Sequence, residues 1–461
     1  MISASVGEVA RVVDGTLVDG ARANDQVQGV TSDSRSIEAG QLFVALQGTQ
    51  VDGHDFARQA IASGAAVVLA SRGVGAPAIV VDDVLLALGK LARHHIEQLP
   101  GATVIAITGS VGKTTTKDLL AHVLTTIGPT VAPPGSFNNE LGLPMTVLTA
   151  DAATRFLVLE MGARSAGHID YLCGIAPPKV GVELAVGSAH IGEFGGREEI
   201  AKAKAELVRA LPASGIAVLN EDDDYVRSMS EQTTARAVTF GESRNADMRA
   251  ENVRSDQLDR ASFTLCSPDG QAVVDLRLPG RHLVPNALAA AATAWALGVP
   301  LEVVARRLGT ATSVSRWRME TSERVDGLIV INDAYNASPE SVRAALKSLK
   351  HIGQDRRTWA VLGEMRELGE ASVAEHDSIG RLVVRLDVQR LVVVGEAARP
   401  IYLAAQHEGS WGEEAAFVPD VDAAIELLLA EVRPDDVVLL KASRAVGLER
   451  AANALLAGEC Q

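Results

Sequence analysis

The sequence is poor in aromatic residues, in cysteine and in positive charge. Among its 461 residues, phenylalanine, tryptophan and tyrosine make up 3%, three positions are cysteine, and the formal net charge is −15. So few aromatic side chains argue against a base-stacking surface for single-stranded nucleic acid, and the acidic balance argues against a general binder of the phosphate backbone. We therefore expect no nucleic-acid partner, although a local loop can still bind a phosphate-bearing small molecule.

Long apolar runs and a secretory leader are also missing. No run of roughly 18 apolar residues predicts a transmembrane helix, and the first residues lack the basic and apolar regions of a signal peptide. Cys173, Cys266 and Cys460 are too few and too scattered for a disulfide framework. We expect a cytoplasmic monomer with reduced thiols and no membrane insertion.

The composition is otherwise that of a soluble globular protein, with 47% apolar and 22% charged residues, which excludes a disordered chain or a coiled coil. A chain of this length exceeds what one hydrophobic core usually holds. The turn-forming pair Pro100-Gly101 marks one domain boundary, and a second lies near residue 310, so the sequence predicts three domains. We place them at residues 1–99, 100–310 and 311–461.

Alternating apolar segments predict an α/β fold throughout. In the first domain we expect strands at 27–30 and 42–46 and helices at 56–63 and 85–99. The second is predicted to hold a parallel sheet covered on both faces, with strands at 104–107, 156–159, 180–186 and 216–219 and a helix at 117–127. The third reads as a doubly wound, Rossmann-like domain with strands at 328–332, 358–362, 391–395 and 437–441 and helices at 339–350 and 371–385.

A glycine-bearing loop between the strand at 104–107 and the helix after it carries the clearest chemistry. It reads Thr108-Gly109-Ser110-Val111-Gly112-Lys113-Thr114-Thr115-Thr116. Glycines let backbone N–H groups approach phosphate oxygens, the helix N-terminus adds partial positive charge, the lysine binds β- and γ-phosphates, and the Thr114 hydroxyl can bind Mg²⁺. The usual pattern has its first glycine at the position of Ile107, whereas here the upstream glycine is Gly109, so the loop is a shortened variant. The alternative is an ordinary turn with a solvated lysine, but the strand–loop–helix context favours nucleotide binding.

Two side chains at the carboxyl edge of the predicted sheet are candidate metal ligands. Glu160 ends the strand at 156–159, and His190 follows the strand that ends at Val186. Parallel sheets bind ligands at this edge, and Mg²⁺ prefers oxygen ligands. Each residue alone is more simply a solvated carboxylate or a hydrogen-bonded loop histidine; beside a phosphate loop, metal binding is favoured.

Lys204 lies on the apolar side of a helix predicted over Arg197 to Leu211, between Ile200 and Leu207. Burying an unpaired ammonium is unfavourable, so the pattern alone favours a lysine that extends to the protein surface. The alternative is a lysine altered by reaction with CO₂ to a carbamate, an anion that binds Mg²⁺.

Several motifs together resemble the Mur ligases over nearly the whole chain. They are the loop 108–116, Gly135-Ser136-Phe137-Asn138-Asn139-Glu140-Leu141-Gly142-Leu143-Pro144, Glu160-Met161-Gly162, Gly187-Ser188-Ala189-His190, Ser32-Asp33-Ser34-Arg35, Phe43-Val44-Ala45-Leu46-Gln47-Gly48 with Asp52-Gly53-His54, Asn332-Asp333-Ala334-Tyr335-Asn336-Ala337-Ser338-Pro339 and Gly363-Glu364-Met365-Arg366-Glu367-Leu368-Gly369. The last two are typical of the branch that adds D-alanyl-D-alanine. The D-N-P-R tetrapeptide expected in the diaminopimelate-adding branch is absent from the sequence.

The resemblance implies an ATP- and Mg²⁺-dependent amide ligase of peptidoglycan precursor synthesis, and hence a part in cell-wall formation, cell shape and division. Its substrates would be UDP-N-acetylmuramoyl-tripeptide and D-alanyl-D-alanine, joined through an acyl phosphate. The first domain would bind the UDP-sugar, the second ATP, and the third would close over ATP and bind the dipeptide. A sister ligase that adds one amino acid and a nucleotide-driven switch without ligase chemistry remain the alternatives.

The resemblance also assigns roles residue by residue. The nucleotide would be held by Gly109, Ser110, Val111, Gly112, Lys113, Thr114, Thr115, Asn286, Arg318, Asp333 and Asn336, with Asn286 at the adenine. Thr114, Glu160, His190 and Lys204 as a carbamate would bind the metal, and the catalytic residues would be Lys113, His190 and Lys204. Asn138 and Asn139 would face the muramoyl substrate, and Ser34 and Arg35 would lie near the uridine diphosphate.

Four positions depart from the family pattern. Asparagine is usual at Ala185 and at Leu283, and glycine is usual at Trp317. The K-G-S-R element reads Lys441-Ala442-Ser443-Arg444. These departures bear on the contacts to nucleotide and on loop geometry, not on the class of reaction.

Overall fold

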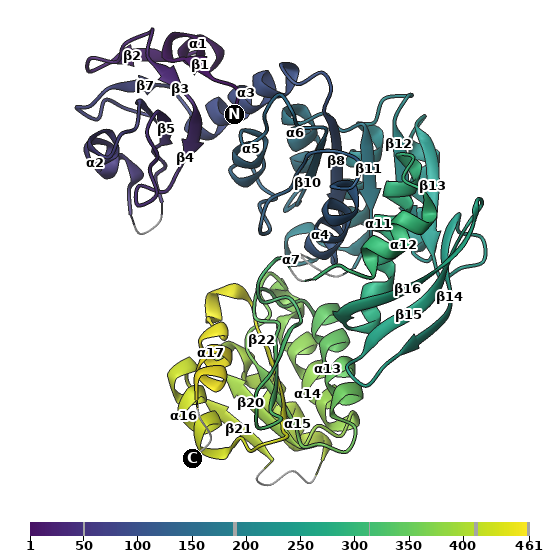
Figure 1. Cartoon of the computed structure of the whole chain (residues 1–461). Helices are drawn as coiled ribbons and strands as arrows, with labels where there is room; N and C mark the ends of the chain where they lie inside the picture. Colours follow the sequence, from purple (N-terminus) through teal and green to yellow (C-terminus); the bar gives the residue numbers. More distant parts are fainter. Residues whose placement is uncertain (49–50, 188–190, 313, 410–413, 459–461) are drawn as a thin grey trace.

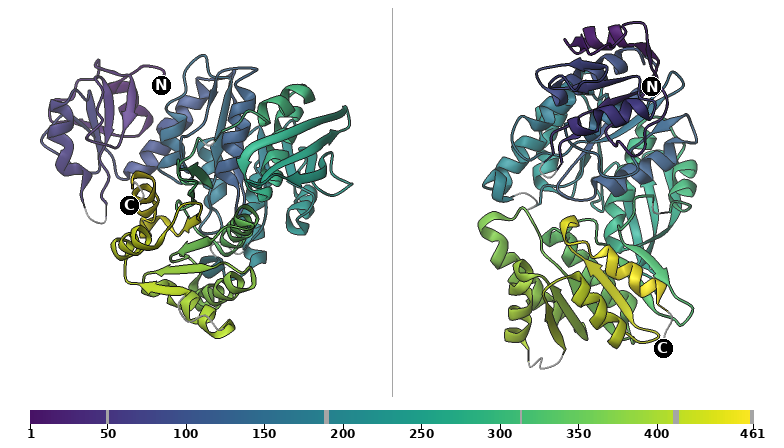
Figure 2. Two further views of the ribbon diagram at one scale, coloured as in Figure 1. Left: turned by 60° about the horizontal axis from the view of Figure 1, so that its bottom comes forward. Right: turned by 90° about the vertical axis from the view of Figure 1, so that its left-hand side faces the viewer.

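The computed structural model describes residues 1–48, 51–187, 191–312, 314–409 and 414–458. They fold into three α/β blocks that follow one another along the chain (Figure 1). The first block lies at one end of the central block and the third packs against another side of it, as the further views in Figure 2 show. This arrangement leaves the central block in contact with both of the others.

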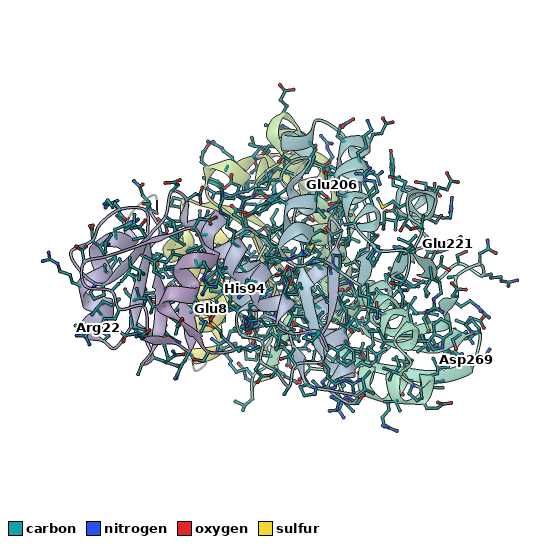
Figure 3. The ribbon with its side chains drawn as sticks, turned by 90° about the horizontal axis from the view of Figure 1, so that it is seen from above. Glu8, Arg22, His94, Glu206, Glu221 and Asp269 are labelled. Carbon is teal, nitrogen blue, oxygen red and sulfur yellow. The ribbon has the colours of Figure 1, made fainter. Side chains whose placement is uncertain are left out.

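The first block is built on a five-stranded sheet in the order β2-β7-β6-β5-β4, in which only β2 runs antiparallel to its neighbour. Glu8 and His94 lie side by side where α1 meets α3, with 3.4 Å between Glu8 Oε1 and His94 Nε2 (Figure 3). Helix α3 also packs against α5 and α6 of the central block, so one apolar core runs through both blocks. The elements are β1 (Ala4–Ser5), α1 (Val6–Val12), β2 (Thr16–Val18), β3 (Gln26–Val27), β4 (Gly29–Thr31), β5 (Gln41–Val44), α2 (Ala57–Ala62), β6 (Val67–Ala70), β7 (Ala78–Val80) and α3 (Val84–Glu97).

The central block holds the longest sheet of the described residues, in the order β16-β15-β14-β13-β12-β11-β8-β10-β9. The parallel sheet predicted from the sequence is confirmed from β9 to β14, and the antiparallel strands β15 and β16 extend it. Strands and short helices include β8 (Thr103–Thr108), β9 (Thr130–Val131), α5 (Gly142–Val147), β10 (Phe156–Glu160), α6 (His168–Ile175), β11 (Val180–Glu183), α7 (Ile191–Phe194), β12 (Ile216–Asn220), α10 (Asp224–Ser228), β13 (Arg236–Gly241), β14 (Met248–Ser255), β15 (Arg260–Ser267) and β16 (Gly270–Pro279).

Helices cover both faces of this sheet. On one face lie α4 (Lys113–Leu124), α11 (Val284–Ala296) and α12 (Leu301–Leu308). They bury an apolar core against the sheet, in which the alanines of α11 allow close helix packing. On the other face lie α5, α6, α8 (Arg197–Lys204) and α9 (Glu206–Arg209). Because successive residues of a strand point to opposite faces, a strand can place neighbouring polar residues in different layers.

The third block is a doubly wound sheet in the order β17-β18-β22-β19-β20-β21, in which only β17 is antiparallel. This is the Rossmann-like arrangement predicted from the alternation of strands and helices. Its elements are β17 (Glu320–Glu323), β18 (Ile329–Asn332), α13 (Pro339–Gly353), β19 (Thr358–Leu362), α14 (Ser372–Arg385), β20 (Arg390–Val394), α15 (Arg399–Glu408), β21 (Ala415–Val418), α16 (Val421–Glu431), β22 (Val437–Lys441) and α17 (Glu449–Ala457).

Some predicted elements differ from the observed ones at their ends. The helix predicted at 117–127 is α4 and begins earlier, at Lys113, because Gly112 with φ of 86° turns the chain directly into it. The helix predicted over 197–211 is divided into α8 and α9 at Ala205. The strand predicted at 180–186 ends at Glu183. None of the helices in the described ranges is long and apolar enough to cross a membrane.

Candidate functional site

The loop between β8 and α4 has a backbone that only glycine accommodates easily at two positions. Gly109 has φ of 145° and Gly112 has φ of 86°. A Cβ atom at Gly109 would lie 2.8 Å from Leu184 Cβ, and one at Gly112 would lie 2.1 Å from Asn286 Nδ2. The sequence pattern therefore predicts the backbone correctly, because both glycines are required by conformation and by space.

Neighbouring elements hold this loop in place. Ser110 N–H donates to the carbonyl of Ala185 at 2.8 Å, and its hydroxyl accepts from Gly187 N–H at 2.9 Å. The Asn286 amide donates to the Gly112 carbonyl at 3.1 Å and to Thr116 Oγ1 at 3.0 Å. Asn286 is thus an anchor of the phosphate loop in this structure, and its expected contact with adenine stays a prediction.

A cavity of about 500 Å³ lies between the central and third blocks, and the phosphate loop opens into it. Most of the residues singled out from the sequence line this cavity, although they are scattered over more than 200 positions of the chain. The predicted residues that line it are Ser110, Val111, Gly112, Lys113, Thr114, Thr115, Asn138, Asn139, Lys204, Asn286, Arg318, Asp333 and Asn336.

Gly109, Glu160, Ser34 and Arg35 do not line the cavity. Gly109 lies at the base of the loop. Ser34 and Arg35 belong to the first block, where the Arg35 side chain is 86% exposed and its guanidinium pairs with Asp33 at 2.8 Å. His190 lies outside the described residues. The structure therefore joins the nucleotide and muramoyl candidates in one place and leaves the uridine candidates apart from it.

Glu160 is fully buried at the end of β10, and within the described residues only one of its two carboxylate oxygens is hydrogen-bonded. Ser136 Oγ donates to its Oε2 at 3.0 Å, whereas Oε1 has no hydrogen-bond partner among the described residues. Lys113 and Lys117 are nearby cations, Lys117 Nζ lying 4.0 Å from Oε1. A buried carboxylate oxygen without a donor is suited to a cation. In the described part of the chain no three His, Cys, Asp or Glu side chains group to hold a metal by themselves, so Thr114 and phosphate oxygens would have to complete such a site.

Lys204 is buried, 5% exposed, and does not extend to the surface as the sequence pattern alone favoured. Its counter-charge is Glu183, which is fully buried in β11 and has no hydrogen-bond partner within the described residues. Burial and the nearby Lys113 ammonium lower the pKa of Lys204 to about 7, against the opposing effect of Glu183. Burial raises the pKa of Glu183 well above its usual value, with Lys204 and Lys113 acting in the opposite direction.

The strand register explains why Glu160 and Glu183 have different neighbours. Glu160 pairs with Ile107 of β8, and Glu183 pairs with Thr108, the next residue. Since consecutive residues point to opposite faces, Glu160 lies on the α4 face and Glu183 on the α8 face, where Lys204 lies. Two carboxylates thus flank Lys113 from the two layers of the block, and burial lowers the pKa of Lys113 while Glu160 raises it.

The third block contributes a set of charged side chains to the other wall. Arg318 donates to Thr114 Oγ1 at 3.1 Å and stacks over the ring of Tyr335 at 4.3 Å. Lys441 pairs with Asp333 at 2.5 Å and donates to the Asn336 carbonyl at 3.0 Å. Burial lowers the pKa of Lys441, with Asp333 opposing the shift. The Arg318 hydrogen bond connects the third block to the phosphate loop, and the Lys441 contacts order the wall of the third block beside it.

Sequence reasoning missed several residues of the site, chiefly Lys117, Glu183, His282, Tyr335 and Lys441. Two carried a signal: Glu183 is an acid within an apolar strand, and Lys117 is a cation on the side of α4 that is buried. Tyr335 and Lys441 stand in family motifs but received no role, and His282 lies in the short 3₁₀ helix Arg281–Leu283. Their placement on the cavity identifies all three as residues of the site.

The structure shows what surrounds each of the four residues that depart from the family pattern. Ala185 accepts a hydrogen bond from Ser110 N–H through its carbonyl, and both Ala185 and Leu283 line the cavity. Trp317 has φ of 60°, a conformation that suits glycine, and its ring lies 4.2 Å from the Arg444 guanidinium. Ala442 is buried against Gly363, where a Cβ atom would lie 2.8 Å from the alanine methyl.

Comparison with known proteins agrees with this architecture. Family models match residues 26–96 (Mur ligase family, catalytic domain), 107–294 (Mur ligase middle domain) and 317–444 (Mur ligase, glutamate ligase domain). The UDP-N-acetylmuramoyl-tripeptide--D-alanyl-D-alanine ligase of Mycobacterium tuberculosis strain H37Rv is 50% identical, over 100% of this chain and 99% of that protein. The ligase of the same name from Bacillus subtilis strain 168 is 33% identical, over 97% of each.

Solved structures agree as well. A crystal structure of MurF from Acinetobacter baumannii superposes with a TM-score of 0.87, 32% identity and 99% coverage of both chains. MurF ligase from Thermotoga maritima in complex with ADP gives a TM-score of 0.79 and 30% identity, covering 93% of this chain and 97% of that one. With its phosphate loop, three blocks and full-length relatives, the chain belongs to the Mur ligase family.

Proposed function

We propose that this chain is the ATP-dependent ligase that joins D-alanyl-D-alanine to UDP-N-acetylmuramoyl-tripeptide in peptidoglycan precursor synthesis. The observation that carries the proposal is the single cavity in which the Lys113 loop faces Asn138 and Asn139 on one side and Arg318 and Asp333 on the other. The names of the relatives that match over their full length support the same pair of substrates.

The chemistry requires activation of a carboxylate. A free carboxylate does not yield an amide with an amine in water, because hydroxide is a poor leaving group. Transfer of the γ-phosphoryl group of ATP makes an acyl phosphate, the amine attacks its carbonyl carbon, and phosphate leaves. Catalysis of this kind is mainly alignment and charge neutralisation.

The cavity walls divide these tasks. Lys113 and the backbone N–H groups of its loop neutralise the terminal phosphates, and Asn138 and Asn139 orient the muramoyl peptide whose carboxylate is phosphorylated. Arg318 carries positive charge from the third block to Thr114 at the phosphate loop. Docking of the third block also excludes water, which protects an acyl phosphate from hydrolysis.

Mg²⁺ fits the residues present. Thr114 and Oε1 of Glu160, which accepts no hydrogen bond within the described residues, would hold it beside the phosphates. Lys204 as a carbamate would contribute, with His190 as the further predicted ligand. When bound, the ion would neutralise charge on the transferred phosphoryl group. The buried amine of Lys204, with its pKa lowered to about 7, is neutral in a larger fraction than an ordinary lysine, which is the form that reacts with CO₂.

The wider features of the proposal follow from the same assignment. Residues 1–99 bind the UDP-sugar with Ser34 and Arg35 near the diphosphate, residues 100–310 bind ATP, and residues 311–461 close over ATP and bind the dipeptide. The protein acts as a cytoplasmic monomer on soluble substrates, with neither nucleic acid nor membrane as a partner.

A substrate comparison tests this function. Purified protein with ATP, Mg²⁺ and UDP-N-acetylmuramoyl-tripeptide is expected to release phosphate when D-alanyl-D-alanine is added, and not with single amino acids. Phosphate release that depends on a single amino acid would instead identify a sister ligase, and release without any acceptor would identify a nucleotide-driven switch. Lys113→Ala protein is expected to join the two peptides at a strongly reduced rate; an undiminished rate would overturn the proposal.

A further inference from the structure

Lys117 is a fully buried cation that lies next to the active-site cavity without lining it. It stands one turn after Lys113 in α4, and its side chain is 0% exposed. A buried ammonium is stable only when acceptors surround it. Its surroundings therefore show which parts of the fold depend on it.

The acceptors of Lys117 come mainly from the loop that carries the muramoyl-facing residues. Lys117 Nζ donates to the carbonyl of Pro133 and, at 3.2 Å, to that of Gly135. Asp118 Oδ1 lies at 2.9 Å and Glu160 Oε1 at 4.0 Å. One ammonium thus binds the phosphate-loop helix to the start of the loop 133–139 and to the end of β10.

The same loop is linked onward to the cavity. Ser136 Oγ donates to Glu160 Oε2 at 3.0 Å and accepts from Asn138 Nδ2 at 3.0 Å. Gly162 N–H donates to the Asn138 carbonyl at 2.9 Å. Asn138, which lines the cavity, is thus hydrogen-bonded through Ser136 to Glu160. The other oxygen of Glu160 forms an ion pair with Lys117 at 4.0 Å.

The segment that leads into the third block meets the same cation. Ser315 Oγ lies 3.5 Å from Lys117 Nζ, and Ser315 N–H donates to Asp118 Oδ2 at 3.1 Å. Three residues later the segment carries Arg318, which contacts Thr114. The elements around Lys117 thus carry the phosphate loop, the muramoyl loop and a residue of the closing block.

We propose that Lys117 is a positioning residue that fixes the muramoyl-peptide loop 133–139 relative to the phosphate loop, so that the carboxylate and the γ-phosphate are aligned for transfer. This inference rests on the proposed function. Lys117 touches no reacting atom; it acts through the carbonyls of Pro133 and Gly135 and through Glu160. A misplacement of the reacting groups by about 1 Å reduces the rate by about 10²-fold. A residue that fixes the two substrate-binding loops relative to each other therefore affects the rate.

The test is Lys117→Met, which keeps the length of the side chain and removes its charge. Hydrogen exchange in full-length protein is expected to become about tenfold faster in peptides covering residues 131–141, with peptides covering 358–362 unchanged. The kcat/KM for UDP-N-acetylmuramoyl-tripeptide is expected to fall by about tenfold to 10²-fold, while the Kd for ADP and the KM for D-alanyl-D-alanine change by less than about threefold. Lys202→Met is the matched control, because Lys202 is exposed and forms its ion pair with Glu199 within the same helix turn.

Ser136→Ala provides a second variant that removes no buried charge. It cuts the link between Glu160 and Asn138 and is expected to change the same two quantities in the same direction, by a smaller factor. The proposal is overturned if Lys117→Met leaves both hydrogen exchange at residues 131–141 and kcat/KM for the tripeptide unchanged. If that variant does not fold, the proposal is overturned by a Ser136→Ala protein in which both quantities equal those of the wild type. If the wild type itself fails to join the substrates, the proposed function is refuted, and the exchange result still decides whether Lys117 holds the loop.

Discussion

Gly112 and Asn286 are expected to act as one unit in nucleotide binding. An alanine at position 112 would have to adopt φ of 86° and would place its Cβ 2.1 Å from Asn286 Nδ2. A left-handed conformation costs a non-glycine residue about 1 kcal/mol. Displacing the Asn286 amide breaks its hydrogen bonds to the Gly112 carbonyl and to Thr116, at about 1 kcal/mol each. Gly112→Ala should therefore destabilise this loop conformation by about 3 kcal/mol; because this is the conformation that binds ADP, the affinity for ADP should fall by about two orders of magnitude.

A double-mutant cycle separates the two contributions. Asn286→Ala alone loses the same two hydrogen bonds, for about 2 kcal/mol, and leaves room for the new methyl group. The double variant should then lose about 3 kcal/mol, as Gly112→Ala does, and not the sum of about 5 kcal/mol. Isothermal titration with ADP measures all four proteins. Gly101→Ala is the matched control, since no atom of the described residues lies within 4 Å of a Cβ there. Additive losses, or Gly112→Ala protein that binds ADP within about twofold of wild type, would refute the reasoning.

Three further changes test other parts of the site. Lys204→Ala should lose most ligase activity and regain part of it with acetate, and an active alanine variant would contradict the role of Lys204. CO₂-free buffer should inhibit the wild-type enzyme. Bicarbonate should reverse this inhibition more readily at pH 8 than at pH 6, because a pKa of about 7 leaves the Lys204 amine mainly neutral only above pH 7. In urea unfolding, Trp317→Gly should be more stable than Trp317→Ala by about 1 kcal/mol, because only glycine relieves the strain at φ of 60°; the opposite order would contradict it. Gly192→Ala should lower kcat with ADP affinity unchanged, because its Cβ would lie 2.5 Å from Gly369 N where the central and third blocks meet. Gly196→Ala, whose Cβ would meet no atom of the described residues within 4 Å, should keep the wild-type kcat; equal kcat in both variants would contradict a role for closure of the third block.

The family assignment also clarifies which departures matter. Trp317 stands where the family usually has glycine, yet its backbone keeps the conformation that glycine would adopt. The contact of its ring with Arg444 offsets part of that strain, since a cation over an aromatic ring contributes about 0.5–1 kcal/mol at a partly exposed site. The segment before Arg318 thus keeps its course in spite of the substitution.

Local sequence determined the parts of this protein whose chemistry depends on neighbours in the chain. The order strand, glycine-bearing loop, helix specifies the phosphate loop, because positive φ at Gly109 and Gly112 and the start of α4 at Lys113 are set within a few residues. The alternation of apolar segments likewise predicted three α/β blocks. Even the unusual position of Lys204 in an apolar helix face was visible in the sequence.

Only the tertiary structure decided which charges meet. Lys204 alone suggested a lysine that reaches the surface, but the register of β11 against β8 brings Glu183 to the layer of α8 and keeps both groups buried. Lys117 read as the first residue of a helix, and its role emerged only when the loop 133–139 folded over it. Such contacts join residues far apart in sequence, and no local periodicity encodes the partner of a buried charge, because its energy depends on which acceptors the whole fold places around it.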